Sequence, residues 1–123
     1  MTDDGRSEAG GARCRIDVGA DGGYEWRMVA QNGRVVAVSA GSHDGYGACL
    51  ADFAEVCARA GELTGGVQHT LGGNGWMWVL RDAGGRTAVV SARAYERHST
   101  CRAAYDRFRA LLGELGGVTG SCP

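Results

Sequence analysis

The chain has 123 residues, of which 22 are glycine and one is proline, and its formal net charge is −1. This length is typical of one globular domain. With 44% hydrophobic and 22% charged residues, the composition excludes a disordered tail and a membrane protein. The charge is uneven: residues 1–63 have six Arg against ten acids, and residues 64–123 have seven Arg against four, so the halves carry −4 and +3.

The first part of the chain, residues 1–12, is predicted to form a flexible leader. Its start is acidic and has no apolar segment, so a secretory signal is not expected. No apolar run approaches the ~18 residues of a membrane-spanning helix. Five cysteines, an odd number without C-x-x-C spacing, argue against a disulfide framework or a zinc site. We therefore expect a cytoplasmic protein with reduced thiols, no metal, no cofactor and no membrane partner.

The rest of the chain contains an internal repeat at an offset of 52 residues, which pairs residues 13–63 with 64–123. The match needs no gap and covers residue types that rarely coincide by chance. Identical residues in the first copy, each found again 52 positions later, are Gly23, Trp26, Gly33, Arg34, Val38, Ser39, Ala40, Cys49, Ala51, Ala58, Gly61, Glu62 and Leu63.

Each copy is predicted to begin with three strands. The alternating patterns place them at 14–18, 24–31 and 34–40, and again at 67–71, 76–82 and 86–92. The third strand follows a two-residue turn, Asn32-Gly33 or Gly84-Gly85. Asn-Gly favours a type I′ turn, because this turn needs positive φ at both positions. Such a hairpin would pair residue 31 with 34, 29 with 36 and 27 with 38.

A helix is predicted to end each copy, over residues 47–60 and 99–112. The spacing i, i+4, i+7, i+11 gives one apolar stripe on each helix, formed by Cys49, Phe53, Val56 and Ala60, and by Cys101, Tyr105, Phe108 and Leu112. Gly61 and Gly113 stand where a helix commonly stops. The Gly-Gly-Val sequences that follow predict short strands at 65–67 and 116–118.

These elements predict an α+β fold in which two tandem β-β-β-α(-β) repeats form one sheet with two helices on one face. A single copy of about 50 residues would bury too little surface to be robust alone. We therefore expect the two copies to form one compact domain, an intramolecular pseudo-dimer.

The strand and turn residues also carry a family resemblance. The stretch from Gly23 through Tyr24-Glu25-Trp26 to Asn32-Gly33 and Ser39, with its second copy from Gly75 to Ser91 and Tyr95, resembles the YegP-like family of small proteins of unknown function. The resemblance implies a β-β-β-α-β unit, present in tandem or as a homodimer, and one sheet with exchanged terminal strands. The chain departs from the family pattern at His43, Gly84 and the acidic pair Asp44 and Glu96.

The aromatic face of the predicted sheet is expected to meet the helices. We predict a core that includes Trp26, Trp78, Tyr24, Trp76, Phe53, Tyr105 and Phe108. The opposite face would be open, and it would combine valines and Met77 with Arg27, Arg34, Arg81 and Arg86. We name these four arginines as candidate binding residues, against the alternative of an ordinary solvated face whose valines are covered by arginine stems.

Three functional hypotheses remain open at this point. The first is a non-enzymatic interaction module that binds a protein partner or a second copy through the open face. The second is binding of nucleic acid or another anionic ligand by the second repeat, with its additional arginines Arg93, Arg97, Arg102, Arg107 and Arg109. The third and least favoured is a small enzyme with Cys or His chemistry, because the sequence has no recognisable catalytic motif and His43, His69 and His98 lack metal-ligand spacing.

The cysteines are interpreted mainly as core residues. Cys49 and Cys101 lie on the predicted inner helix faces, where small buried hydrophobic residues are common. Cys14 and Cys122 lie near the two ends and would approach each other if the terminal strands were neighbours. No role is assigned to Cys14, Cys57 or Cys122.

Overall fold

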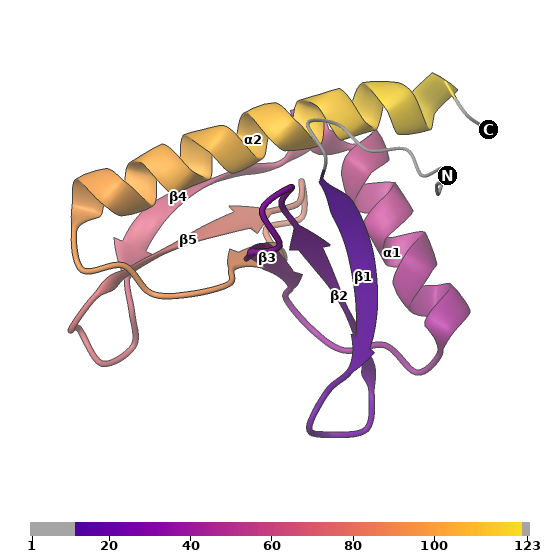
Figure 1. The fold of residues 1–123 in the computed structure, drawn as a ribbon, viewed down its shortest axis with the longest axis horizontal. Helices are drawn as coiled ribbons and strands as arrows, with labels where there is room; N and C mark the ends of the chain where they lie inside the picture. Colours follow the sequence, from indigo (N-terminus) through magenta and orange to yellow (C-terminus); the bar gives the residue numbers. More distant parts are fainter. Residues whose placement is uncertain (1–11, 122–123) are drawn as a thin grey trace.

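The computed structural model describes the backbone of residues 12–121 and the side chains of residues 12–115. It has the predicted α+β architecture, with a six-stranded antiparallel sheet and two α-helices (Figure 1). In chain order the elements are β1 (Arg13–Val18), β2 (Tyr24–Val29), β3 (Val35–Ser39), α1 (Tyr46–Ala58), a 3-10 turn (Ala60–Glu62), β4 (Thr64–His69), β5 (Trp76–Arg81), β6 (Thr87–Ser91) and α2 (His98–Ser121).

The sheet is symmetric about its centre. The strand order is β1-β2-β3-β6-β5-β4, so the third strands of the two halves pair with each other. Val38 lies opposite Val90, Ala37 opposite Ser91, and Ser39 opposite Val89. Val38 and Val90 are 52 positions apart, and the register therefore relates each half to the other by a half-turn.

The core lies between one face of this sheet and both helices. α1 packs on β1 and β2, α2 packs on β4 and β5, and the helices also contact each other (Figure 1). The predicted apolar stripes meet the aromatic residues of the central strands, as the helical spacing requires. Fully or nearly fully buried members of this cluster include Trp26, Met28, Cys49, Val56, Trp78, Leu80, Cys101, Tyr105, Phe108 and Leu112.

Residues 52 positions apart make the same local contacts. The backbone N–H groups of Trp26 and Trp78 each donate to the serine on the neighbouring strand, Ser39 Oγ and Ser91 Oγ, both at 3.3 Å. Isolated bridges also correspond, Tyr24 with His43 and Trp76 with Tyr95. Positions 52 apart can therefore be compared directly as structural equivalents.

The hairpins differ from the predicted two-residue turns. Arg27 pairs with Val38 as expected, but a bulge follows, and Val29 pairs with Val35 instead of residue 36. The Ala30 N–H donates to the Arg34 carbonyl, which closes a three-residue loop over residues 31–33. The last residue of this loop, Gly33, has a left-handed φ of 87°. The second hairpin repeats this pattern with Gly85 at 86°. Three-residue loops of this kind place one glycine at the bulge.

Two further expectations are wrong at the second helix. α2 runs to Ser121, so Gly113 does not end it and residues 116–118 are not a strand. Leu112 and Leu115 are buried, and this packing outweighs the weak helix propensity of glycine. The strand that follows the first helix, β4, pairs with β5 in the second half of the chain.

Some predictions fall outside the described residues. These are the leader over residues 1–11 and Cys122; Ala12, the last residue assigned to the leader, is buried in the core. Within the part of the chain that the structure describes, neither helix combines the length and the apolar character needed to cross a membrane.

Candidate functional site

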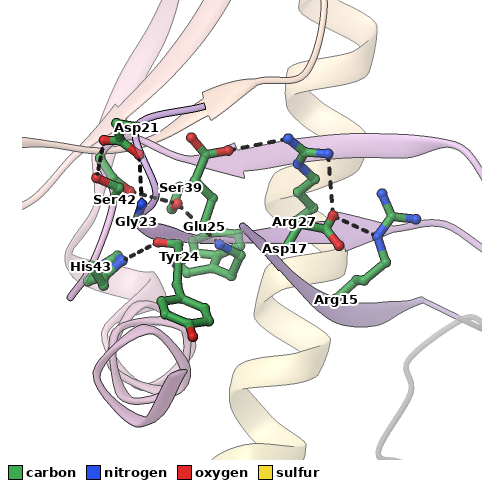
Figure 2. Close-up of polar contacts among 12 residues, drawn as sticks. Arg15, Asp17, Asp21, Gly23, Tyr24, Glu25, Arg27, Ser39, Ser42 and His43 are labelled. Carbon is green, nitrogen blue, oxygen red and sulfur yellow. Dashed lines mark hydrogen bonds and ion pairs between the residues drawn. The ribbon is translucent and has the colours of Figure 1, made fainter. Parts of the chain in front are cut away.

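Two of the four candidate arginines lie on the sheet face opposite the helices. Figure 2 shows Arg27 between two acids, with its Nη1 3.3 Å from Asp17 Oδ2 and its Nη2 3.3 Å from Glu25 Oε1. Asp17 is also 2.9 Å from Arg15 Nε. Arg81 Nη2 donates to Gln68 Oε1 at 3.3 Å. The charges on this face are thus largely engaged with each other.

The valines of the same face are more buried than we expected for an open sheet face. Val29 and Val79 are 1% and 4% exposed, although neither belongs to the core cluster beneath the helices. Val38 and Val90, at the centre of the sheet, are half-buried. Val29 and Val79 therefore offer almost no apolar surface to a partner, and Val38 and Val90 offer only part of theirs.

The other two candidate arginines lie at the ends of the hairpins. Arg34 precedes β3 and Arg86 precedes β6, so neither is a strand residue. Both side chains are exposed, and they line two separate pockets at equivalent places in the two halves. The structure therefore divides the predicted group of four into a paired set on the sheet and an unpaired set at the hairpins.

The pocket beside Arg34 belongs to a basic groove, which we call the Tyr95 groove. One part, of about 340 Å³, is lined by Arg34, Val35, Val36, Arg93 and Tyr95. An adjoining part, of about 390 Å³, shares Arg93 and Tyr95 and adds Ala94, Glu96, Arg97 and Thr100. The groove joins the β2–β3 hairpin to the segment that leads into α2.

The electrostatics of this groove centre on Tyr95. Burial raises the pKa of the Tyr95 hydroxyl, whereas Arg93, Arg107 and Arg34 act to lower it. The Arg93 guanidinium lies 5.7 Å from the centre of the Tyr95 ring. Arg34 and Arg93 thus line the groove together with Tyr95, and Arg107 acts electrostatically on the same hydroxyl, which stays protonated at neutral pH.

These arginines lack acidic partners. Among the described side chains, none of Arg34, Arg93, Arg97 and Arg107 lies within ion-pair distance of a carboxylate. By contrast, Arg102 pairs with Asp106, and Arg109 donates to the Leu63 carbonyl at 2.7 Å. Unpaired arginines that converge on one groove form an anion-binding arrangement, because guanidinium groups match oxyanions in charge and geometry.

The equivalent place in the first half is the Asp52 groove. Its two parts, of about 490 and 280 Å³, share Asp52, Asp82 and Ala88. Asp52 Oδ2 accepts a hydrogen bond from Trp26 Nε1 at 2.7 Å and lies 3.5 Å from His43 Nε2. His43 Nδ1 is 3.3 Å from the Tyr24 carbonyl oxygen, as Figure 2 shows. The Asp52 carboxylate therefore lines both parts of this groove and already has hydrogen-bonding neighbours from within the chain.

A loop contact holds His43 in this position. Asp21, in the β1–β2 turn, accepts hydrogen bonds from the Gly23 N–H at 2.9 Å and from Ser42 Oγ at 2.8 Å (Figure 2). Both bonds lower the pKa of Asp21. A Cβ at Gly23 would lie 2.7 Å from Ser42 Cβ, so this close approach requires glycine.

The four cysteines that the structure describes are buried or half-buried. Cys49, Cys57 and Cys101 are buried, and Cys14 is half-buried. Burial raises the pKa of Cys14 to about 12 and that of Cys49 and Cys101 above the ordinary value, which disfavours the nucleophilic thiolate. Across residues 12–115 no group of three potential ligands could hold a metal ion.

The predicted core residues occupy two environments. Trp26, Trp78, Phe108 and Tyr105 are buried. Tyr24, Trp76 and Phe53 are half-buried at the edge of the core. Trp76 stacks on His69, with ring centres 3.9 Å apart, and its other neighbour His98 meets it edge-on.

Sequence reasoning missed Tyr95, His43 and Asp52 as groove residues. Arg93, Arg97 and Arg107 were noted only as part of a basic half. One signal was present: the repeat aligns Asp52 with Ala104 and His43 with Tyr95. These mismatches lie beside Trp26 and Trp78, which are identical in the two copies.

Comparisons with known proteins identify the fold. No family model and no curated protein matches the chain. Two solution NMR structures do: YegP from E. coli, a protein of unknown function, with a TM-score of 0.66 at 12% identity over 87% of this chain and 90% of that one, and a UPF0339 protein from Shewanella oneidensis, with a TM-score of 0.65 at 10% identity over 83% and 85%. The YegP-like fold expected from the sequence is confirmed, and at these identities the likeness shows the fold alone.

Proposed function

We propose that this protein is a non-enzymatic binding module that takes a small anionic ligand in the Tyr95 groove. The observation that carries the proposal is that Arg34 and Arg93 line one groove with Tyr95 and, among the described side chains, have no carboxylate partner. Arg107 acts electrostatically on the same Tyr95 hydroxyl. In a groove partly screened from water, such a group of arginines is stabilised by an incoming anion. This is the anionic-ligand hypothesis of the sequence, now assigned to particular residues.

The contrast with the sheet face supports this choice. On that face Arg27 already has two carboxylate partners, so an anionic ligand would have to displace them. The interaction module on the sheet face, with a protein partner or a second copy, stays a hypothesis. It predicts that Arg27 and Arg81 matter for binding, whereas our proposal predicts that they do not.

Two observations favour binding over catalysis. The raised thiol pKa values disfavour cysteine nucleophiles. In the Asp52 groove the neighbouring hydroxyl, Ser42 Oγ, donates to Asp21 and not to His43, so the His43–Asp52 pair has no adjacent activated nucleophile. The free thiols of Cys14, Cys49 and Cys101 also suit the reducing cytoplasm, where we place the protein.

The proposal includes the tandem-repeat origin of the fold. The symmetric register at Val38 and Val90 and the matching serine contacts are what a fused dimer of one unit would produce. A covalent link keeps the two units at an effective concentration in the mM range. The Tyr95 groove uses both units, since Arg34 comes from the first and Arg93 from the second.

Titration calorimetry with citrate and inorganic phosphate at low ionic strength tests the function. We expect saturable binding that weakens by about tenfold or more in Arg93→Ala and in Arg34→Ala, because each substitution removes a charge-assisted contact. Arg86→Ala is the matched control: it removes the same charge at the equivalent hairpin and should leave the affinity unchanged.

Other outcomes would replace the proposal. Loss of binding in Arg27→Ala or Arg81→Ala, with Arg93→Ala unaffected, would move the site to the sheet face. Failure of both anions to bind, together with salt-dependent binding of a single-stranded oligonucleotide, would favour the nucleic-acid alternative.

A further inference from the structure

The equivalent positions 52 and 104 differ in a way that bears on the ligand. In the first half, Asp52 Oδ2 accepts the hydrogen bond of the Trp26 indole at 2.7 Å. In the second half, Trp78 occupies the place of Trp26, but Ala104 occupies the place of Asp52. The second half thus retains the donor and lacks the carboxylate.

Among the residues that the structure describes, the indole N–H of Trp78 has no hydrogen-bond partner. Trp78 is 0% exposed, and its Nε1 is buried with no hydrogen-bond acceptor within reach. Its ring meets Tyr105 at 61°, an angle close to the 69° at which Trp26 meets the equivalent Phe53, and it also stacks on Phe108. A buried donor without an acceptor costs free energy, so a native structure normally provides one.

A second donor lies over the same place. The Tyr95 hydroxyl interacts electrostatically with Cys101 and Arg107, which flank Ala104 by three residues on either side along α2. The repeat aligns Tyr95 with His43 and Ala104 with Asp52, so the contact between His43 and Asp52 in the first half is the geometric reason to expect the Tyr95 ring beside Ala104. Among the described residues no acceptor bonds to it. In the first half the corresponding residue, His43, faces the Asp52 carboxylate at 3.5 Å.

The place that Asp52 fills in one half is therefore surrounded, in the other, by two donors and by the arginines of the Tyr95 groove. We infer that the ligand of this groove is a carboxylate, whose oxygens take the place of the missing Asp side chain beside Ala104. They would accept hydrogen bonds from Trp78 Nε1 and the Tyr95 hydroxyl, with Arg34, Arg93 and Arg107 neutralising the charge. This inference rests on the proposed function and names the chemical class of its ligand.

The test uses the indole resonances of the ¹⁵N-labelled full-length protein during titration with sodium acetate, against sodium chloride at the same ionic strength. We expect a saturable downfield shift of the Trp78 indole proton, because a new acceptor reaches it. The Trp26 indole is an internal control, because its N–H already donates a hydrogen bond to Asp52, and its resonance should not move. Trp→Phe variants assign the signals.

A substitution then supplies the missing group. Ala104→Asp should move the Trp78 resonance without acetate and weaken acetate binding by about tenfold or more, because its own carboxylate occupies the site. Ala103→Asp is the matched control, since it adds the same charge at the exposed neighbouring position and should preserve the response. Tyr95→Phe, which removes only the second donor, should also weaken binding.

The outcomes separate this inference from the proposed function. A Trp78 resonance that ignores acetate, while citrate or phosphate still binds in an Arg93-dependent manner, overturns the carboxylate site and leaves the anion groove in place. A shift with inorganic phosphate but not with acetate overturns the ligand class. Absence of binding by every anion overturns both. If Ala104→Asp does not fold, the wild-type titration and Tyr95→Phe still decide.

Discussion

The two grooves of this protein occupy equivalent places and are filled differently. In the first half, Trp26, Asp52 and His43 form a closed set in which the chain itself supplies the anion. In the second half, Trp78, Ala104 and Tyr95 lack that anion, and Arg34 and Arg93 line the groove beside Tyr95. The backbone contacts of the two places are the same, so the difference comes from side chains alone.

This comparison teaches how a structural position can become a binding position. A carboxylate held by a buried indole stabilises the first half as part of the fold. With Ala104 at the equivalent position, the second half has a buried indole donor that no acceptor among the described residues satisfies. The most informative perturbations therefore act on one half and use the other as its control.

The largest expected effect comes from removing either central tryptophan. Trp26→Ala and Trp78→Ala should each destabilise the protein by about 3–5 kcal/mol, because both side chains are fully buried. Urea unfolding followed by circular dichroism measures the change. If one half tolerates the substitution with a loss below about 1 kcal/mol, the two halves do not share one core.

A smaller loss is expected at the first strand of the second half. A Cβ at Gly65 would overlap the Val79 carbonyl oxygen, whereas nothing lies within 4 Å of a Cβ at Gly66. Gly65→Ala should cost about 1–3 kcal/mol as an overpacking substitution, and Gly66→Ala should be nearly neutral. Thermal unfolding of both variants measures this difference, and equal stability of the pair would contradict the close β4–β5 approach.

A direct contrast of the two indoles is expected to be smaller still. Trp26→Phe removes the bond to Asp52 and should cost about 1.5 kcal/mol more than Trp78→Phe, which removes a donor that has no acceptor. The estimate is at the lower end for a charged acceptor because Asp52 is 36% exposed. Chemical unfolding of both variants gives the difference, and a larger loss in Trp78→Phe would show that its N–H is already satisfied.

The smallest effect is a pH dependence that belongs to the first half. Burial, with Cys49 and Cys57 nearby, raises the pKa of Cys14 from 9.0 to about 12, whereas the equivalent residue of the second half is Gly66. Between these values the unfolded chain loses the thiol proton and the folded chain keeps it, so stability is full below pH 9 and falls as the pH rises towards 12. Urea midpoints at increasing pH should fall less steeply in Cys14→Ala; parallel curves would count against the shift.

The fold could be predicted from the sequence because the patterns that indicate its strands, turns and helices are local. Alternating strands, glycine turns and one apolar stripe per helix predicted the order of the elements. Each of these patterns occurs in both copies of the repeat, which supports the prediction. The helix end at Gly113 failed because burial of Leu112 and Leu115, a tertiary effect, outweighs local propensity. The turn type failed because Asn32-Gly33 also fits a three-residue loop with a bulge.

The candidate site was harder to predict from the sequence because its residues are far apart in the chain. Arg34 and Tyr95 meet only because β3 pairs with β6, and no local pattern encodes that pairing. The difference between Asp52 and Ala104 is visible in the aligned copies. It gains a chemical meaning only when the Trp26 and Trp78 side chains are placed, because their indole N–H groups determine which position needs an acceptor.

The half-turn symmetry about Val38 and Val90 has a consequence for how such a site can evolve. In a pair of identical chains, every substitution appears in both members at once, so a carboxylate lost from one groove is lost from the other as well. A single chain that contains both units is free of this constraint. One unit can keep its internal anion and secure the shared sheet, while the other gives up the same residue and becomes a receptor.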